Sequence, residues 1–246
     1  MRKKDILYAA KRVRIDDFDF GAGTADVFDE MLSRSVPFYA EIQRMVVELA
    51  GDFIKEGTAV YDLGCSTGTT LAQLATTCPT STVQLIGVDN SQPMLAHARE
   101  KLAGAGCLAR STLLAADVND VAIDNASAVL MILTLQFVRP LNRENVIQRL
   151  GGGLNAGGAL ILVEKVLPDD PALNRLFIDH YLAFKRRQGY SELEIAQKRE
   201  ALENVLVPYR VEENLELLAR AGFAPIDTFF RWYNFIGLVA IKSGRP

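Results

Sequence analysis

Hydrophobic residues gather in short, nearly continuous runs from residue 58 onwards, and segments with helical spacing separate these runs. Runs without polar alternation are typical of strands that are buried on both faces of a parallel sheet. Seven strands are predicted, over 58–64, 83–89, 111–117, 126–134, 158–165, 226–232 and 235–242. The pattern therefore predicts an α/β protein with a mostly parallel sheet and helices on both faces.

The segments between these strands place apolar residues at helical spacing. Helices are predicted from about Thr69 and over 91–103, 143–150 and 211–223. Ser91 precedes the second of them and is a candidate N-cap, because its hydroxyl can accept a hydrogen bond from a free backbone N–H. The run Gly151–Gly153 is expected to end the third helix.

Two regions fall outside this alternation. Residues 1–56 precede the first strand and are expected to form a helical cap. Residues 166–205 follow the fifth strand, are highly charged and have helical periodicity, so we expect a helical insertion there. No repeat or low-complexity linker divides the chain, which predicts a single domain over 1–246.

Composition and charge narrow the classes of function. The net charge of −3 does not indicate a protein that binds nucleic acid through charge. The three cysteines, Cys65, Cys78 and Cys107, have no CxxC spacing and favour a reducing cytosol over a disulfide framework. Two histidines and these scattered cysteines offer no ligand set for zinc, so no metal is expected.

The apolar runs also bear on location. The basic start of the chain is followed by an apolar run, 6–10, that is too short for the core of a signal peptide. No run approaches the roughly 20 apolar residues of a membrane span. These features predict a cytoplasmic protein without a membrane partner.

The segment "YDLGCSTGTT" (61–70) predicts a ligand-binding turn between the first strand and the following helix. Glycine at 64 and 68 permits unusual backbone angles and close approach of a ligand. The start of the next helix offers free N–H groups to an anion. Asp89, at the end of the second strand, is placed to bind both hydroxyls of a ribose.

Two further carboxylates strengthen the prediction of an adenosine-type ligand. Asp117 ends the third strand, where it can meet an adenine amino group, and Asp62 can organise an ammonium group or a water. A dinucleotide fold uses G-x-G-x-x-G, whereas this loop reads G-C-S-T-G and lacks the second glycine. Ser66 can donate its hydroxyl to a carboxylate, which favours S-adenosylmethionine over NAD.

Several segments resemble those of a known family. The segments "VYDLGCSTG", "GVDNSQPML", "AADV" and "LNAGGALILVEK" resemble successive motifs of class I S-adenosylmethionine-dependent methyltransferases. The segments "RSVPFY", "LTLQFV", "GYSELEIAQKR" and "NFIGLVA" resemble the carboxy-S-adenosyl-L-methionine synthase family, over nearly the whole chain. The resemblance implies the Rossmann-like class I methyltransferase fold.

The resemblance also implies a reaction. That family takes S-adenosyl-L-methionine and prephenate and makes carboxy-S-adenosyl-L-methionine, phenylpyruvate and water. The methyl carbon beside the sulfonium becomes an ylide, which captures the CO2 lost from prephenate. The product serves a separate enzyme that builds 5-oxyacetyluridine at the tRNA wobble position, so no direct contact with nucleic acid is implied. A homodimer is also implied, and the apolar "FIGLVA" and the N-terminal cap are candidate surfaces for it.

Site residues follow from the same resemblance. Arg199 matches the arginine that binds the carboxylate, whereas we expect Lys185, Arg186 and Arg187 to be solvated helix charges. The positions that match contacts to the ligand are Tyr39, Gly64, Cys65, Ser66, Asp89, Asn90, Asp117, Val118 and Ile132.

One position departs from the family pattern. The family carries asparagine where this chain has Ile132, and isoleucine has no hydrogen-bonding side chain. A water, a backbone carbonyl or Thr134 takes over its role, or the handling of substrate differs. The alternatives to carboxylation are an ordinary small-molecule methyltransferase, a non-catalytic S-adenosylmethionine-binding partner protein and, more distantly, an NAD oxidoreductase.

Overall fold

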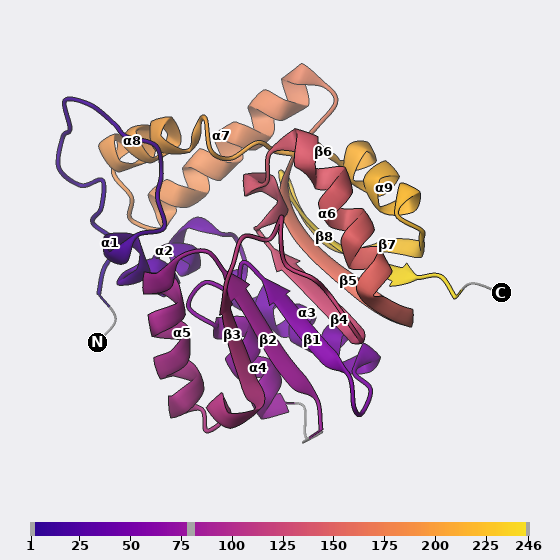
Figure 1. Ribbon diagram of the computed structural model, residues 1–246. Helices are drawn as coiled ribbons and strands as arrows, with labels where there is room; N and C mark the ends of the chain where they lie inside the picture. Colours follow the sequence, from indigo (N-terminus) through magenta and orange to yellow (C-terminus); the bar gives the residue numbers. More distant parts are fainter. Residues whose placement is uncertain (1–2, 78–81, 245–246) are drawn as a thin grey trace.

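A computed structural model describes residues 3–77 and 82–244; Cys78 lies outside them. Seven strands form one twisted sheet in the order β3-β2-β1-β4-β5-β8-β7 (Figure 1). Their bounds are β1 Ala59–Leu63, β2 Gln84–Asp89, β3 Ser111–Ala115, β4 Ala126–Ile132, β5 Leu154–Leu167, β7 Phe223–Trp232 and β8 Phe235–Lys242. The first five strands run parallel, and β8 is antiparallel to both of its neighbours. A further two-residue strand, β6 (Tyr209–Arg210), pairs with the end of β5.

The strand order reverses direction beside β1. From β1 the chain builds outward to β2 and β3, and it then returns to place β4 and β5 on the other side of β1. In open α/β sheets such a reversal leaves a crevice outside the carboxyl ends of the strands, where ligands bind. The sheet therefore offers a site at the ends of β1, β2 and β4.

Helices cover both faces of the sheet, as the sequence predicts. One face packs against α3 (Tyr39–Phe53), α4 (Thr69–Thr77) and α5 (Gln92–Gly104). The other face packs against α6 (Pro140–Gly153) and α9 (Val211–Arg220). The edge strand β3 is the least covered, because several of its side chains, Leu114 among them, are exposed.

The predicted N-cap of α5 is present. The Ser91 hydroxyl accepts a hydrogen bond from the backbone N–H of Met94 over 3.3 Å. This bond satisfies one of the free N–H groups in the first turn.

The predicted glycine run does end α6, because the helix stops at Gly153, but the three glycines form its last turn and do not lie beyond it. A Cβ atom on Gly151 would lie 2.9 Å from the carbonyl oxygen of Ala221, and one on Gly153 would lie 2.1 Å from that of Ile123. These two glycines therefore allow neighbouring backbone to approach the helix closely. They do not supply a left-handed turn.

A third layer crosses the carboxyl edge of the sheet. It contains the N-terminal segment, α1 (Ala22–Ala25), α2 (Phe28–Ser35), α7 (Pro171–Arg187) and α8 (Glu192–Leu202) (Figure 1). Residues 3–20 of the N-terminal segment contain no helix or strand. Two short 3-10 helices, η1 (Leu108–Arg110) and η2 (Leu135–Phe137), complete the described elements.

The apolar "FIGLVA" segment is not available as a dimer surface. It forms β8, which lies inside the sheet between β5 and β7, and most of its side chains are buried. A strand with neighbours on both sides has no free edge for a second chain. In the described part of the chain, no helix is long and apolar enough to cross a membrane.

The glycines of α6 give a matched pair of variants. We expect Gly153→Ala to lower the free energy of unfolding by about 1–3 kcal/mol, because its Cβ would overlap the backbone of Ile123. A Cβ atom on Gly152 would meet no other atom within 4 Å, so Gly152→Ala should be neutral or stabilising by about 0.5–1 kcal/mol. Urea unfolding of both variants tests the close packing, which an equal effect at the two positions would contradict.

Candidate active site

A cavity of about 930 Å³ lies between the carboxyl edge of the sheet and the layer that crosses it. Its floor comes from the ends of β1, β2 and β4 and from the loops that follow them. Its roof comes from α2, α7 and α8. A volume of this size fits a drug-sized ligand or a nucleoside together with a second small molecule.

The loop between β1 and α4 forms one wall. Gly64 and Gly68 have φ of 74° and 73°, which favour glycine. A Cβ atom on Gly64 would lie 2.4 Å from Oγ1 of Thr134, so no side chain fits there. The backbone N–H groups of Gly64 and Cys65 both donate to the carbonyl of Val88, which ties the loop to β2.

Asp89 holds this loop against the start of α5. Its Oδ2 accepts a hydrogen bond from the Ser66 N–H at 2.9 Å, and its Oδ1 accepts one from the Ser91 N–H at 2.8 Å. Burial raises the pKa of Asp89, although these two amide hydrogen bonds act in the opposite direction. The carboxylate is thus fixed in position on the cavity wall, where each oxygen still has a free lone pair for a ligand.

Asp62 is a buried carboxylate, and one of its oxygens, Oδ2, has no hydrogen-bond partner among the described residues. It is 2% exposed and lines the cavity. Burial, and then the nearby Asp89 carboxylate, raises the pKa of Asp62 to about 7. A cationic group in the cavity would supply the missing partner.

The part of the cavity wall that follows β2 and β3 is more exposed to solvent. Asn90 and Asp117 are exposed residues that line the cavity, and Val118 is half-buried beside them. Oδ1 of Asp117 accepts hydrogen bonds from the backbone and side-chain N–H groups of Asn119 at 2.8 and 2.6 Å. Its other oxygen accepts none from a described residue and can accept one from a ligand.

The opposite half of the cavity is basic. Lys165 on β5, Lys185 on α7 and Lys198 and Arg199 on α8 all line it. Lys198 pairs with buried Asp5 at 3.4 Å. Arg199 is exposed and forms no hydrogen bond or ion pair with any described residue, including its neighbour Glu200. Asp62 and Asp89 thus line the cavity from the ends of β1 and β2, whereas these four cations line it from β5, α7 and α8. Two further charged residues, Arg139 and Glu203, also line it.

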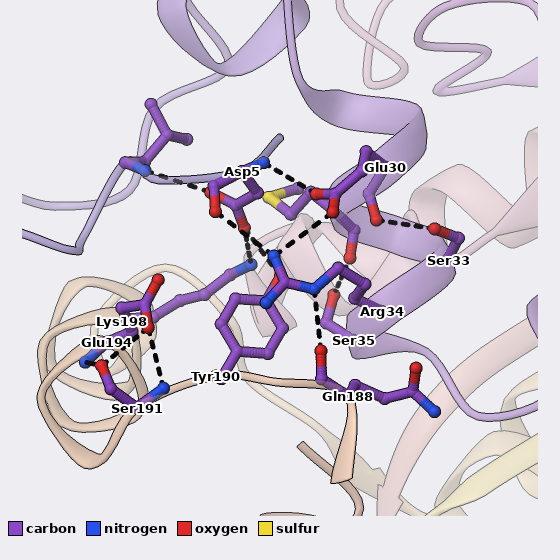
Figure 2. A network of polar contacts seen from close by, with 12 residues as sticks. Asp5, Glu30, Ser33, Arg34, Ser35, Gln188, Tyr190, Ser191, Glu194 and Lys198 are labelled. Carbon is purple, nitrogen blue, oxygen red and sulfur yellow. Dashed lines mark hydrogen bonds and ion pairs between the residues drawn. The ribbon is translucent and has the colours of Figure 1, made fainter. Parts of the chain in front are cut away.

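Asp5 also belongs to the network that closes the roof (Figure 2). Its Oδ2 accepts a hydrogen bond from the Tyr190 hydroxyl at 2.7 Å, and its backbone carbonyl accepts one from Arg34 at 3.3 Å. Arg34 is paired in turn with Glu30 at 3.3 Å. The network ties the N-terminal segment to α2 and to the segment that joins α7 and α8.

Two of the five described non-glycine residues with positive φ line the cavity. Ser66 and Leu133, which line it, have φ of 48° and 58°, and Phe38, just before Tyr39, has φ of 55°. Left-handed backbone at a residue other than glycine costs about 1–3 kcal/mol and persists at functional sites. Asn125 and Tyr233, with φ of 48° and 41°, do not line the cavity, so only part of the strain lies at the site.

The comparisons with known proteins agree with this geometry. Residues 60–158 match a family described as "Methyltransferase domain". A carboxy-S-adenosyl-L-methionine synthase of Methylococcus capsulatus is 56% identical over 97% of this chain and 99% of its own length. The chain belongs to the carboxy-S-adenosyl-L-methionine synthase family. The synthase of Aeromonas hydrophila is 42% identical over 100% of this chain and 99% of its own.

Solved structures confirm the predicted fold of this family member. An S-adenosyl-L-methionine-dependent methyltransferase from Methanococcus maripaludis, described as putative in its own name, superposes with a TM-score of 0.63. It is 18% identical and covers 96% of this chain and 99% of its own, so the likeness concerns the fold alone. The family is one of enzymes that use S-adenosylmethionine, and the Rossmann-like class I methyltransferase fold predicted from the sequence is confirmed.

All of the site residues predicted from the sequence line this same cavity. They are Tyr39, Gly64, Cys65, Ser66, Asp89, Asn90, Asp117, Val118, Ile132 and Arg199. Their contacts with a ligand stay predictions. Among the described residues, no group of three His, Cys, Asp or Glu side chains is placed to hold a metal ion.

Ile132 ends β4 on the cavity wall, half-buried. Its carbonyl accepts a hydrogen bond from the Thr134 hydroxyl at 3.2 Å. In this arrangement the Thr134 hydroxyl donates to the protein, and its oxygen can accept a hydrogen bond from a ligand. Of the replacements considered for the family asparagine, a donor from Thr134 is the least compatible with this geometry.

The sequence interpretation of Lys185 as a solvated charge is wrong. Its side chain lines the cavity and is 5% exposed, whereas Arg186 and Arg187 on the same helix are exposed. The sequence does not single out Lys165 or Lys198 either. The sequence does not distinguish a lysine that is buried beneath a helix from one that is exposed to water. Only the position of α7 over the sheet shows which of these lysines are buried.

We expect Asp89→Ala to weaken binding of S-adenosylmethionine about 100-fold or more. The variant loses the predicted ribose contact and frees the loop that Ser66 anchors. Calorimetric titration measures the affinity. Asp120→Ala is the control, because Asp120 is an exposed carboxylate that does not line the cavity. Unchanged affinity in Asp89→Ala would remove this residue from the site.

We also expect binding of S-adenosylmethionine to depend on pH through Asp62. The ligand's cationic groups favour the carboxylate form, whereas in the free protein the pKa is about 7. Below that pH, binding must displace a proton, so affinity should fall by up to about tenfold for each pH unit. Titrations from pH 8 to pH 6 measure the slope, and Asp62→Asn should bind more weakly with a flatter profile. A slope retained in that variant would assign the titration to another group.

Proposed function

We propose that this protein converts S-adenosyl-L-methionine and prephenate to carboxy-S-adenosyl-L-methionine, phenylpyruvate and water. The observation that carries the proposal is the separation of charge in the cavity, together with membership of the synthase family. Asp62 and Asp89 suit the cationic amino acid and the ribose of the nucleoside. The basic half suits the carboxylates of the second substrate and of the product.

The reaction balances without an external oxidant or reductant. In prephenate, the bond from the ring to its carboxylate breaks and CO2 leaves. The electron pair makes the ring aromatic and expels the ring hydroxyl as hydroxide. Hydroxide takes a proton from the methyl group beside the sulfonium and becomes water. The resulting ylide carbon forms a bond to the carbon of CO2 and gives the carboxymethyl sulfonium.

The cavity supports this chemistry in two ways. An ylide survives only where bulk water is excluded and fixed charges stabilise it, and the roof of α2, α7 and α8 covers the strand ends. CO2 must also be captured where it forms, which requires both substrates in one cavity. Arg199 is free to form a two-point contact with the carboxylate that is transferred.

A second candidate is an ordinary S-adenosylmethionine-dependent methyltransferase, because Ile132 replaces the family asparagine with an apolar side chain. The basic half of the cavity argues against it, since methyl transfer to a neutral acceptor needs no cluster of cations. A non-catalytic S-adenosylmethionine-binding protein would show ligand binding without turnover.

The cellular setting is also part of the proposal. The product is the carboxymethyl donor for 5-oxyacetyluridine at the tRNA wobble position, with no direct contact to nucleic acid. The net charge of −3 supports the last point. Two described cysteines, Cys65 and Cys107, are free and buried, which supports a reducing, cytoplasmic location. We further propose a homodimer, which sedimentation equilibrium of the purified chain tests.

Mass spectrometry of the protein incubated with S-adenosylmethionine and prephenate tests the reaction directly. We expect a nucleoside that is heavier than S-adenosylmethionine by one CO2, with an equal amount of phenylpyruvate. Unmodified S-adenosylmethionine after long incubation would overturn the carboxylation. Methylated products would then favour the methyltransferase, and Ile132→Asn would be the next variant to assay.

We expect Arg199→Ala to lower the rate of carboxylation about 100-fold or more and to change the affinity for S-adenosylmethionine less than about threefold. The reason is that a two-point contact with a carboxylate is lost, while the nucleoside end of the cavity is unchanged. Arg199→Lys keeps the charge without the planar fork and should be intermediate. Glu200→Ala is the control at the adjacent position. Equal losses of rate and affinity would contradict the proposed role of Arg199.

A further inference from the structure

Two lysines in the basic half of the cavity form no ion pair with an anion of the described residues, although the Asp5 carboxylate attracts Lys185 from a longer distance. The ammonium groups of Lys165 and Lys185 lie 4.8 and 5.0 Å from the centre of the Tyr181 ring. Neither ammonium group forms a hydrogen bond or an ion pair with any described residue. Both residues line the cavity, Lys185 from α7 and Lys165 from β5. The two cations therefore flank one aromatic ring on the cavity wall.

Such an arrangement is costly in the empty protein. The Lys185 side chain is 5% exposed, and burying an ammonium without a partner carries a penalty of several kcal/mol. Burial, and then repulsion from Lys198 and Lys165, lowers the pKa of Lys185 to about 7. Burial, and then Arg199, lowers the pKa of Lys165 to about 8. The ring of Tyr181 compensates these charges only in part, because a cation–π contact contributes about 0.5–2 kcal/mol.

The neighbouring Lys198 differs from this pair. Its ammonium lies 3.4 Å from Asp5, whose carboxylate also accepts the Tyr190 hydroxyl (Figure 2). Arg34 and Glu30 complete that network with one charge of each sign. Lys198 is thus neutralised by the protein itself. Of the four cations described above, Lys165, Lys185 and Arg199 form no ion pair with a described residue.

The wall beside the two lysines is apolar and aromatic. Tyr181 packs against Phe235 with ring centres 5.3 Å apart, and both line the cavity. Ile178 and Leu182, on the same helix as Lys185, also line it. A ligand that fits this region has a carboxylate for the lysines and a flat hydrocarbon body for the aromatic wall.

We propose that Lys165 and Lys185 form a binding subsite for the 2-oxo acid carboxylate of the second substrate, the carboxylate that is not transferred. This inference rests on the proposed function and adds a division of labour to it. Arg199 binds the carboxylate that moves to the sulfonium carbon. The lysine pair holds the three-carbon side chain while the ring loses its own carboxylate and hydroxide. The same pair retains the aromatic 2-oxo acid until release.

Two anion sites are required by the chemistry. The second substrate carries two carboxylates, and only one of them becomes CO2. If a single cation site bound either group, half of the bound molecules would present the wrong carboxylate to the ylide. A fixed anchor for the retained group holds the reacting carboxylate near the methyl carbon, which is the origin of a proximity effect.

Binding of phenylpyruvate to the protein saturated with S-adenosylhomocysteine tests the subsite without turnover. We expect Lys185→Met and Lys165→Met each to weaken this binding about 10- to 100-fold, because each removes a charge-assisted hydrogen bond. Affinity for S-adenosylhomocysteine should change less than about twofold. Arg187→Met is the matched control, since it removes an exposed cation from the same helix.

Thermal unfolding of the same variants separates a binding role from a structural one. Methionine preserves most of the lysine stem and removes a buried, unpaired charge, so the midpoint of Lys185→Met should stay the same or rise. A large fall in the midpoint together with unchanged binding of phenylpyruvate would overturn the subsite.

The outcomes also distinguish this inference from the proposed function. If the wild type makes the carboxylated product while both lysine variants bind phenylpyruvate normally, the subsite is wrong and the function stands. If the wild type makes no product but binds phenylpyruvate through the lysines, the function is wrong and an anion subsite stands. Failure of the wild type to bind phenylpyruvate at all would also overturn the subsite.

Discussion

The energetic cost of burying charge without a partner governs the arrangement around the cavity. Asp62 at one end and Lys165 with Lys185 at the other are largely buried charges that the protein does not balance by itself. Several other buried charges are satisfied internally, as Arg143 shows by donating hydrogen bonds to the carbonyls of Val138 and Val207. The unbalanced charges occur where a ligand can reach them. These unbalanced charges lower the stability of the protein without substrate. A bound substrate supplies the missing partners, which adds to its affinity and fixes its orientation.

The sheet and the roof contribute differently to function. The fold of the sheet is shared with solved structures described as methyltransferases that are less than 20% identical to this chain. The basic residues come mainly from α7 and α8, which follow β5 and cross the carboxyl edge of the sheet. A fold of this kind supports many reactions, and the chemistry depends on side chains that later segments place over the strand ends.

Much of the fold could be predicted because local patterns and tertiary structure agree. The strand from Ala59 and the helix capped by Ser91 follow directly from apolar runs and capping chemistry. The cavity-lining residues on the nucleoside side could be predicted because strand ends in a parallel sheet converge at one edge.

The features that the sequence did not predict depend on contacts between segments that are distant in the chain. Lys185 looks like its solvated neighbour Arg186, and only the packing of α7 on Trp232 and Phe235 through Tyr181 buries that face. In the sequence, Gly153 is typical of a helix terminator. In the structure, glycine is required there because a Cβ atom would overlap the backbone of Ile123, which lies in a different part of the chain. The exposure of a polar residue and the purpose of a glycine are properties of the assembled structure.

The hydrogen bond between Tyr190 and Asp5 has a consequence for biosynthesis. Its partners are 185 residues apart in sequence, and the Phe18 N–H likewise donates to the carbonyl of Ala201. As the chain emerges from the ribosome, its first twenty residues must wait until most of the polypeptide has been made. Contacts of such long sequence separation form slowly because a large loop must close first. The five parallel strands, which end at Leu167, can therefore assemble before the roof does. The nascent chain acquires a closed reaction chamber only near the end of its synthesis.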